Sequence, residues 1–186
     1  MLAEKKEEKY TSDQFLAMYD LKGRYELIGG ALYDMSPSPN IKHQRIVSKL
    51  CVTIGSYIEK HKSKCEVIAA PSDVRLSDED VVQPDLYVVC DPKKFDEHGC
   101  VGAPDWVIEV LSPSNSQHDT VEKLSLYVKA GVREYWIVDP IFEKVLVYPI
   151  EEHRASSVGM FTFRDNIPVG ICKHEEDLLT ICIDNI

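Results

Sequence analysis

The sequence predicts a mixed α/β fold with a central β-sheet flanked by helices. Two helical patterns and a set of apolar, strand-like segments between and after them support this fold class. The chain has 186 residues, a length that suits one domain with an ordinary core. We expect a charged tail over residues 1–10 and a single domain over residues 11–186.

The first part of the domain is predicted to form a short helix and a β-hairpin. Thr11 and Gln14 lie three positions apart, as in the capping box that begins many helices. The hairpin strands are expected over residues 25–28 and 31–35, because the Gly29-Gly30 pair between them favours a two-residue turn.

Two longer helices are expected. Over residues 41–61, apolar side chains recur at steps of three and four, and the connector at residues 36–40 supplies candidate caps. The second helix is predicted over residues 116–130, with Ser116 and Asp119 at its start and Gly131 just after its end.

The central sheet is predicted from segments rich in β-branched and aromatic residues. The segment at 105–111 is almost continuously apolar, as in a central strand buried on both faces. Asp139-Pro140 is expected to turn the chain between the last two long strands, and the final 35 residues are predicted to form short strands. The full set of long strands is expected at residues 66–76, 82–90, 105–111, 134–138 and 144–148.

Composition limits the classes of function. The chain carries 31 acidic and 21 basic side chains, a formal net charge of −10, which argues against a protein that coats nucleic acid through general basicity. The apolar runs are too short to span a membrane, and the N-terminal segment lacks the apolar region of a secretion signal. We therefore expect a cytoplasmic protein that does not enter the membrane.

The six cysteines form no C-x-x-C pair. The group of Cys90, His98 and Cys100 matches no common zinc spacing. We expect reduced and mostly buried thiols, as in most cytoplasmic proteins.

Two carboxylates lie inside apolar strand patterns. Glu109 occupies the middle of the segment at 105–111, and strand alternation places it on the same face as Val107 and Leu111. Asp85 follows Pro84 near the start of another apolar segment. A buried carboxylate is costly without a partner, so each is either a satisfied structural group or part of a site. If the two strands are neighbours, the pair suits Mg²⁺ or Mn²⁺.

Three further side chains are candidates for the same site. Lys123 lies near the start of the helix that follows the Glu109 strand, where a lysine usually faces water. His43 lies on the apolar side of its helix, where a hydrogen-bonded core histidine is the commoner explanation. Glu26 lies in the first hairpin, where a charged residue usually faces solvent.

Several motifs in one order make the chain resemble the Uma-two family of putative restriction endonucleases, formerly a domain of unknown function. The resemblance covers about residues 20–150 and rests on the segments YELIGG at 25–30, MSP at 35–37, HQRIV at 43–47, VQPDL at 82–86, EVLSPS at 109–114, KLxxY at 123–127 and GVxEYWIVDP at 131–140.

That family is placed in the PD-(D/E)XK nuclease superfamily, so the resemblance implies a restriction-endonuclease-like core and a nuclease motif of Pro84-Asp85 followed by Glu109. The lysine that this motif places two positions after the glutamate is Leu111 here. The resemblance suggests that Lys123 supplies the amine instead. His43 and Glu26 match recurring positions of the family.

The resemblance implies a Mg²⁺-dependent endonuclease that hydrolyses DNA, with Mn²⁺ as an alternative ion. Asp85, Glu109 and the backbone carbonyl of Val110 are expected to hold the metal, and Lys123 to act on the water or the phosphate. Gln83 and Tyr127 are candidate accessory residues. The alternatives are a nuclease-fold binding or accessory dimer with little or no catalysis, and a hydrolase of small phosphate esters.

A local basic segment lies within this acidic chain. Residues 41–64 contain six basic side chains against one acid, Glu59. Lys42, Arg45 and Lys49 are candidate contacts to DNA phosphates, and a solvated helix face is the alternative. DNA binding is then expected to be weak and salt-sensitive, and a homodimer is expected by analogy with the superfamily.

Overall fold

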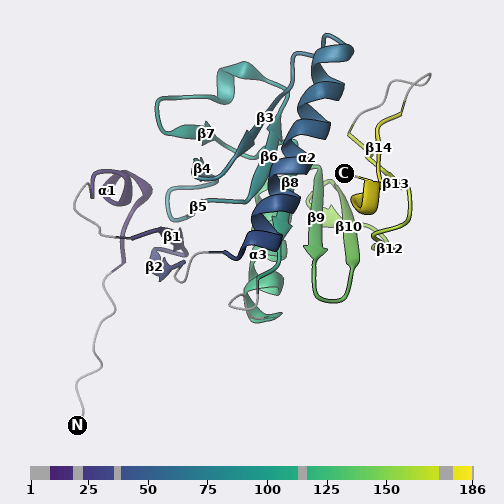
Figure 1. Ribbon diagram of the computed structural model, residues 1–186. Helices are drawn as coiled ribbons and strands as arrows, with labels where there is room; N and C mark the ends of the chain where they lie inside the picture. Colours follow the sequence, from purple (N-terminus) through teal and green to yellow (C-terminus); the bar gives the residue numbers. More distant parts are fainter. Residues whose placement is uncertain (1–8, 19–22, 36–38, 113–116, 172–177, 186) are drawn as a thin grey trace.

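The computed structural model describes residues 9–18, 23–35, 39–112, 117–171 and 178–185 (Figure 1). The predicted mixed α/β architecture is confirmed: the described residues form a central sheet with a long helix on each face. The predicted break at residues 113–116, including the Ser116 cap, lies outside these ranges.

The N-terminal helix and hairpin form as predicted. The helix α1 (Ser12–Leu16) begins at a capping box made by Thr11 and Gln14. The strands β1 (Tyr25–Ile28) and β2 (Ala31–Asp34) pair antiparallel around Gly29 and Gly30, which both have positive φ angles. Glycine has no Cβ and adopts this conformation without strain.

Within the described residues, a seven-stranded sheet forms the centre of the molecule, in the order β11-β10-β9-β8-β6-β3 with β12 also paired to β10. The strand β8 is buried along its whole length, as predicted. It runs parallel to β9 and antiparallel to β6. The strands are β3 (Glu66–Ala69), β6 (Leu86–Val89), β8 (Trp106–Val110), β9 (Glu134–Asp139), β10 (Lys144–Glu151), β11 (Arg154–Ala155) and β12 (Gly159–Thr162).

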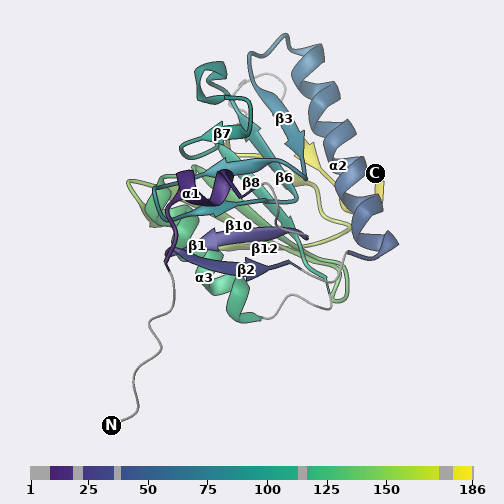
Figure 2. The same cartoon turned by 90° about the vertical axis from the view of Figure 1, so that its left-hand side faces the viewer.

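The two long helices cover opposite faces of this sheet. The helix α2 (Ile41–Lys60) is capped by Asn40, and its apolar stripe packs with Trp106, Ile108 and Val110 on one face. The helix α3 (Gln117–Ala130) contributes Tyr127 to the core on the other face. Figures 1 and 2 show the N-terminal hairpin beside the first turns of α2 and beside α3.

Two predicted strands are each divided between two sheets. The segment at 66–76 forms β3 and β4 (Asp73–Arg75), with the cis Ala70–Pro71 bond between them. The segment at 82–90 forms β5 (Val81–Val82) and β6, with Pro84 between them. Proline has no N–H for a ladder hydrogen bond, so both continuous strands end there. The second sheet has the order β2-β1-β5-β4-β7, where β7 spans Gly99–Val101.

The last part of the chain forms short elements, as predicted. The strands β13 (Ile167–Pro168) and β14 (Thr180–Ile181) pair antiparallel, and a 3-10 turn η2 (Ile183–Asn185) follows. A further 3-10 turn η1 (Pro92–Lys94) precedes β7. None of the helices in the described ranges is long and apolar enough to cross a membrane.

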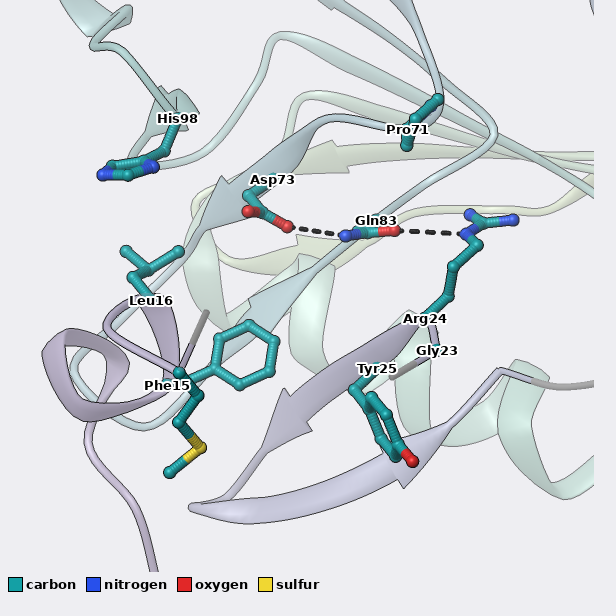
Figure 3. Close-up of a pocket in the computed structure, with 10 residues that line it drawn as sticks. Phe15, Leu16, Gly23, Arg24, Tyr25, Pro71, Asp73, Gln83 and His98 are labelled. Atoms are coloured by element: carbon teal, nitrogen blue, oxygen red, sulfur yellow. Dashed lines mark hydrogen bonds between the residues drawn. The ribbon is translucent and has the colours of Figure 1, made fainter. Parts of the chain in front are cut away.

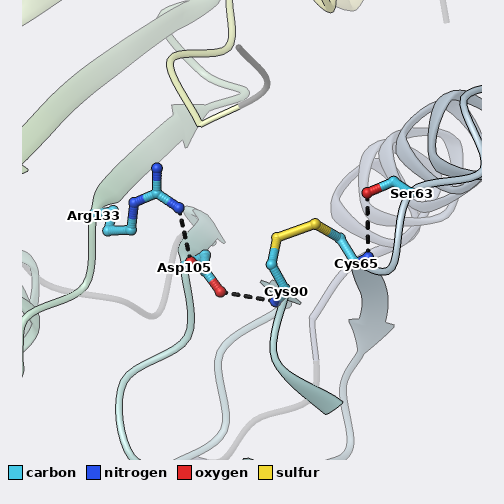
Figure 4. Close-up of a disulfide and its surroundings, with 5 residues drawn as sticks. All are labelled: Ser63, Cys65, Cys90, Asp105 and Arg133. Atoms are coloured by element: carbon cyan, nitrogen blue, oxygen red, sulfur yellow. Dashed lines mark hydrogen bonds and ion pairs between the residues drawn. A yellow bond between two sulfur atoms is a disulfide. The ribbon is translucent and has the colours of Figure 1, made fainter. Parts of the chain in front are cut away.

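The expectation of six reduced cysteines is wrong, because Cys65 and Cys90 form a disulfide (Figure 4). Cys65 precedes β3 and Cys90 follows β6, and the antiparallel pairing of Glu66 with Val89 brings their neighbours opposite one another. The backbone N–H of Cys90 also donates to Asp105 Oδ2. Sequence spacing gave no indication of this pair, because the register of the two strands creates it.

Candidate active site

Asp85 lies where the chain leaves β5 and enters β6. Its Oδ2 accepts hydrogen bonds from Nε2 of His43, at 3.0 Å, and from the backbone N–H of Val110, at 2.9 Å. His43 is buried on the first turn of α2, and its own backbone N–H is bound by the cap residue Asn40. The carboxylate of Asp85 is therefore fixed by both a helix and the central strand β8.

Glu109 is buried on β8 and faces α3. Its Oε1 accepts hydrogen bonds from Nζ of Lys123 and from the hydroxyl of Tyr127, both at 2.9 Å. Lys123 and Tyr127 are four positions apart on α3, so their side chains lie on one face of the helix. Val107 and Leu111 pack in the same core as Tyr127, so the predicted common face of Val107, Glu109 and Leu111 is confirmed.

Glu26 brings the N-terminal hairpin into the same cluster. Its Oε1 lies 2.9 Å from Nζ of Lys123 and accepts a 2.9 Å hydrogen bond from the backbone N–H of Gln83. The Lys123 side chain is only 11% exposed, and those of Glu26 and Glu109 are 5% and 8% exposed. One ammonium group thus lies between two buried carboxylates. The usual solvent-facing positions of Lys123 and Glu26 do not occur here.

The charges of this cluster shift its proton affinities. Burial raises the pKa of Glu109 to about 7, although the nearby Lys123 charge opposes the shift; the negative charges of Asp85 and Glu26 add to it. Burial alone would lower the pKa of Lys123, but Glu109 and Glu26 outweigh it and raise that pKa. Burial and the Glu109 charge raise the pKa of Tyr127 well above its ordinary value. Lys123 therefore stays positively charged at neutral pH.

The cluster leaves oxygen atoms for a cation. In the hydrogen bonds of the described residues, Asp85 uses Oδ2 and Glu109 uses Oε1, so Oδ1 and Oε2 accept none of them. No group of three or more His, Cys, Asp and Glu side chains forms a complete metal site in the described ranges. Two carboxylates with waters and a substrate phosphate are sufficient for Mg²⁺, so the donor set fits a hard divalent ion.

Comparisons with known proteins agree with this architecture. A family model described as "Uma2: Putative restriction endonuclease" matches residues 12–170. The chain belongs to the Uma2 family. A crystal structure of a putative nuclease of the DUF820 family from Anabaena variabilis shares 26% sequence identity with a TM-score of 0.76, over 94% of this chain and 96% of that one. No curated protein sequence matches the chain.

Membership in the Uma2 family confirms the resemblance drawn from the sequence motifs. The structure adds contacts that the motifs could not supply. It brings together Asp85, Glu109, Lys123, Glu26, His43 and Tyr127, with Gln83 joined through its backbone. The hydrogen bond from the Val110 N–H to the Asp85 carboxylate is not indicated by the sequence, since any residue at position 110 except proline could donate it.

The candidate DNA-contacting side chains lie apart from these buried groups. Lys42, Arg45 and Lys49 are exposed on α2. Nζ of Lys42 donates a 2.6 Å hydrogen bond to the carbonyl of Pro140 at the β9–β10 turn. The three basic residues lie on the same helix as His43, at exposed positions between the buried residues of α2. The exposed side chains of Lys42 and Arg45 therefore lie within one helical turn of His43, the residue that binds the Asp85 carboxylate.

Proposed function

We propose that this chain is a Mg²⁺-dependent endonuclease that hydrolyses DNA phosphodiester bonds, with Asp85, Glu109 and Lys123 as its catalytic residues. The observation that carries the proposal is the 2.9 Å contact between Nζ of Lys123 and Oε1 of Glu109. This contact supports Lys123 as the source of the amine, because the motif position that usually holds the lysine is occupied by Leu111.

Asp85, Glu109 and the backbone carbonyl of Val110 are the proposed ligands of Mg²⁺ or Mn²⁺. The bound ion would polarise the phosphate and lower the pKa of a water molecule. His43 and the Val110 N–H hold the Asp85 carboxylate in one orientation. Because the carboxylate is already oriented, less free energy is spent on arranging the oxygen donors when the ion binds.

Lys123 supplies a fixed positive charge beside the reacting phosphate. A preorganised cation in a site with little water stabilises negative charge more strongly than it would in bulk solvent. Glu26 and Tyr127 act as positioning residues, because Glu26 holds the ammonium and the Tyr127 hydroxyl holds the carboxylate that it contacts. The Gln83 backbone fixes Glu26 in turn.

The proposed DNA contacts are Lys42, Arg45 and Lys49 on α2. Their exposure and their position on the helix that carries His43 support this assignment. The net charge of −10 opposes general attraction to DNA, so binding by this surface should be weak and should fall steeply with salt. A homodimer would double the number of such contacts, and we propose this assembly together with a cytoplasmic location.

A cleavage assay tests the function. Supercoiled, linear and single-stranded DNA are incubated with Mg²⁺ or Mn²⁺ and with wild type, Asp85→Ala or Glu109→Ala. The control is Glu59→Ala, which removes an exposed acid on α2. Cleavage by wild type and the control that is lost in both active-site variants supports the proposal.

Equal cleavage by all four proteins would refute the assignment. Absence of cleavage by folded wild type, with DNA binding retained, would instead favour the accessory binding protein. The observation that favours this accessory function is the near-complete burial of Lys123, Glu26 and Glu109, which limits the access of a substrate to them. Calorimetric titration with Mn²⁺ measures metal binding separately from turnover.

A further inference from the structure

A pocket of about 410 Å³ lies between the N-terminal helix and hairpin on one side and the segments of Asp73 and Gln83 on the other (Figure 3). It is lined by residues of four segments: α1 with the start of β1, the β3–β4 connection with the start of β4, the β5–β6 connection, and His98 before β7. Its volume is within the range of pockets that hold small organic groups. The lining residues that the argument uses are Phe15, Arg24, Tyr25, Asp73 and Gln83.

A row of polar side chains forms one wall of the pocket. The Gln83 side-chain nitrogen donates a 2.8 Å hydrogen bond to Asp73 Oδ1, and its Oε1 accepts a 3.4 Å hydrogen bond from Arg24 Nε. These two partners fix the orientation of the amide. An amide held in this way presents one N–H and one oxygen lone pair side by side, which is the arrangement that pairs with the edge of a base.

Aromatic rings form the facing wall. Figure 3 shows Phe15 and Tyr25 on one side of the pocket and the Asp73–Gln83–Arg24 row on the other. The charges of Arg24 and Asp73 have opposite signs, so the wall offers no net charge for an isolated anion. Flat apolar surfaces opposite a hydrogen-bonding row suit a planar, uncharged heterocycle with polar edges.

The pocket adjoins the acid cluster. Arg24 and Tyr25 line the pocket, and Glu26, the next residue on β1, contacts Lys123. Gln83 contributes its side chain to the pocket and its backbone N–H to the Glu26 carboxylate. The pocket and the cluster therefore share Gln83, whose side chain lines the pocket and whose backbone binds Glu26.

We propose that this pocket binds a nucleobase. The inference deepens the proposed function, on which it rests, by giving the substrate an unpaired nucleotide next to the phosphate that reacts. Tyr25 and Phe15 stack on the base, and Gln83 with Asp73 binds its polar edge. Such a base comes either from a single-stranded segment of DNA or from a free nucleotide.

The test is a binding experiment in EDTA on full-length protein carrying Asp85→Ala, so that cleavage plays no part. The probes are a fluorescein-labelled single-stranded octanucleotide, the corresponding duplex, and the four deoxynucleoside monophosphates. Tyr25→Ala and Asp73→Ala are each added, with Tyr33→Ala as the control from the same hairpin. Loss of base stacking is expected to weaken binding about tenfold in Tyr25→Ala. Tyr33→Ala should bind as the parent does.

Weakened binding of either the octanucleotide or a monophosphate in the pocket variants supports the proposal, and the probe affected identifies the source of the base. Without any substitution in the pocket, the same probes should also shift the NMR signals of the Gln83 side-chain amide. Preference for duplex DNA, equal affinities in all variants, or an unmoved Gln83 signal would overturn it. If any of these results is found while the wild type still cleaves DNA, only the pocket proposal fails and the proposed nuclease function stands. If the pocket binds a base but the wild type does not cleave DNA, only the nuclease function fails.

Discussion

Nζ of Lys123 lies 2.9 Å from Oε1 of Glu109, so the first half of α3 is tied to the middle of the central strand β8. The same nitrogen lies 2.9 Å from Oε1 of Glu26 in the N-terminal hairpin. A single cation therefore offsets the repulsion between two buried carboxylates, one from the hairpin and one from the central sheet. Both the stability of the fold and the chemistry proposed for it depend on this group.

Replacing Lys123 with methionine is expected to destabilise the protein. The substitution leaves Glu26 and Glu109 buried without their shared counter-charge, and breaking a buried pair in this way costs about 3–5 kcal/mol. Urea unfolding measures the change. Lys129→Met is the matched control, since Lys129 is exposed on the same helix and should change the free energy of unfolding little.

The double variant Lys123→Met with Glu26→Gln should recover part of that loss, because it removes one of the two stranded charges. Wild-type stability in Lys123→Met alone would show that the buried contact does not exist in solution.

The raised pKa of Glu109 predicts a pH-dependent stability. Its carboxyl group titrates near pH 4.5 in the unfolded chain and near 7 in the folded protein. Between these values the folded state holds more protons than the unfolded state, so a rise in pH lowers the free energy of unfolding. Glu109→Gln removes this contribution.

The measurement is urea unfolding of wild type and Glu109→Gln at about pH 5 and about pH 8, either side of the titration. Wild type should lose stability relative to the variant at the higher pH. If the difference between the two proteins is constant with pH, Glu109 does not titrate abnormally.

His43 is expected to control metal affinity through Asp85. His43→Ala removes the 3.0 Å hydrogen bond that orients the carboxylate, and loss of such a partner typically weakens metal binding about 10–100-fold. Calorimetric titration with Mn²⁺ measures the effect. His43→Asn, which keeps an N–H donor, should recover part of the affinity.

His61→Ala is the control for this prediction, because His61 lies just after the other end of α2 and contacts the Tyr57 carbonyl. Equal metal affinities in His43→Ala and His61→Ala would show that His43 does not position the Asp85 carboxylate for metal binding.

The Cys65–Cys90 disulfide is expected to stabilise the fold by about 3 kcal/mol, since it closes a loop of 25 positions and restricts the unfolded chain. Unfolding with and without reductant measures this contribution. The double variant Cys65→Ser with Cys90→Ser should match the reduced wild type, whereas Cys51→Ala leaves the disulfide intact. Alkylation of thiols in freshly lysed cells reports whether the bond forms in the cell. Reaction of all six cysteines with the thiol reagent under denaturing conditions would show that the bond does not form.

Periodicity and residue type were sufficient for the main helices and for the orientation of Glu109. The pattern at 41–61 corresponds to α2, and alternation along 105–111 placed Glu109 on the same face as Val107 and Leu111. These features follow from local geometry, which the order of residues determines directly. The family motifs then identified Lys123 as a partner although no spacing rule links it to Glu109.

Contacts between elements that are distant in sequence could not be predicted from the residue pattern. Pro71 and Pro84 explain why the strands end, but which sheet the chain joins after each of them depends on contacts with distant strands. The pairing of Cys65 with Cys90 depends on the register of β3 and β6, which a one-residue shift would alter. The role of Glu26 was equally hidden, because a hairpin side chain turns inward only where another element supplies its partner.

Glu26 and Lys123 are 97 positions apart, and their contact gives the cluster a place in the order of synthesis. A chain that is still being translated carries Glu26 in the hairpin 97 positions before Lys123, and Glu109 follows only 14 positions before it. Until Lys123 is made, two of its acids have no counter-charge and the amine is missing. The newly made chain therefore holds every member of the cluster before β9, β10, β11 and β12 have been made, so the charges are paired before the central sheet can be completed.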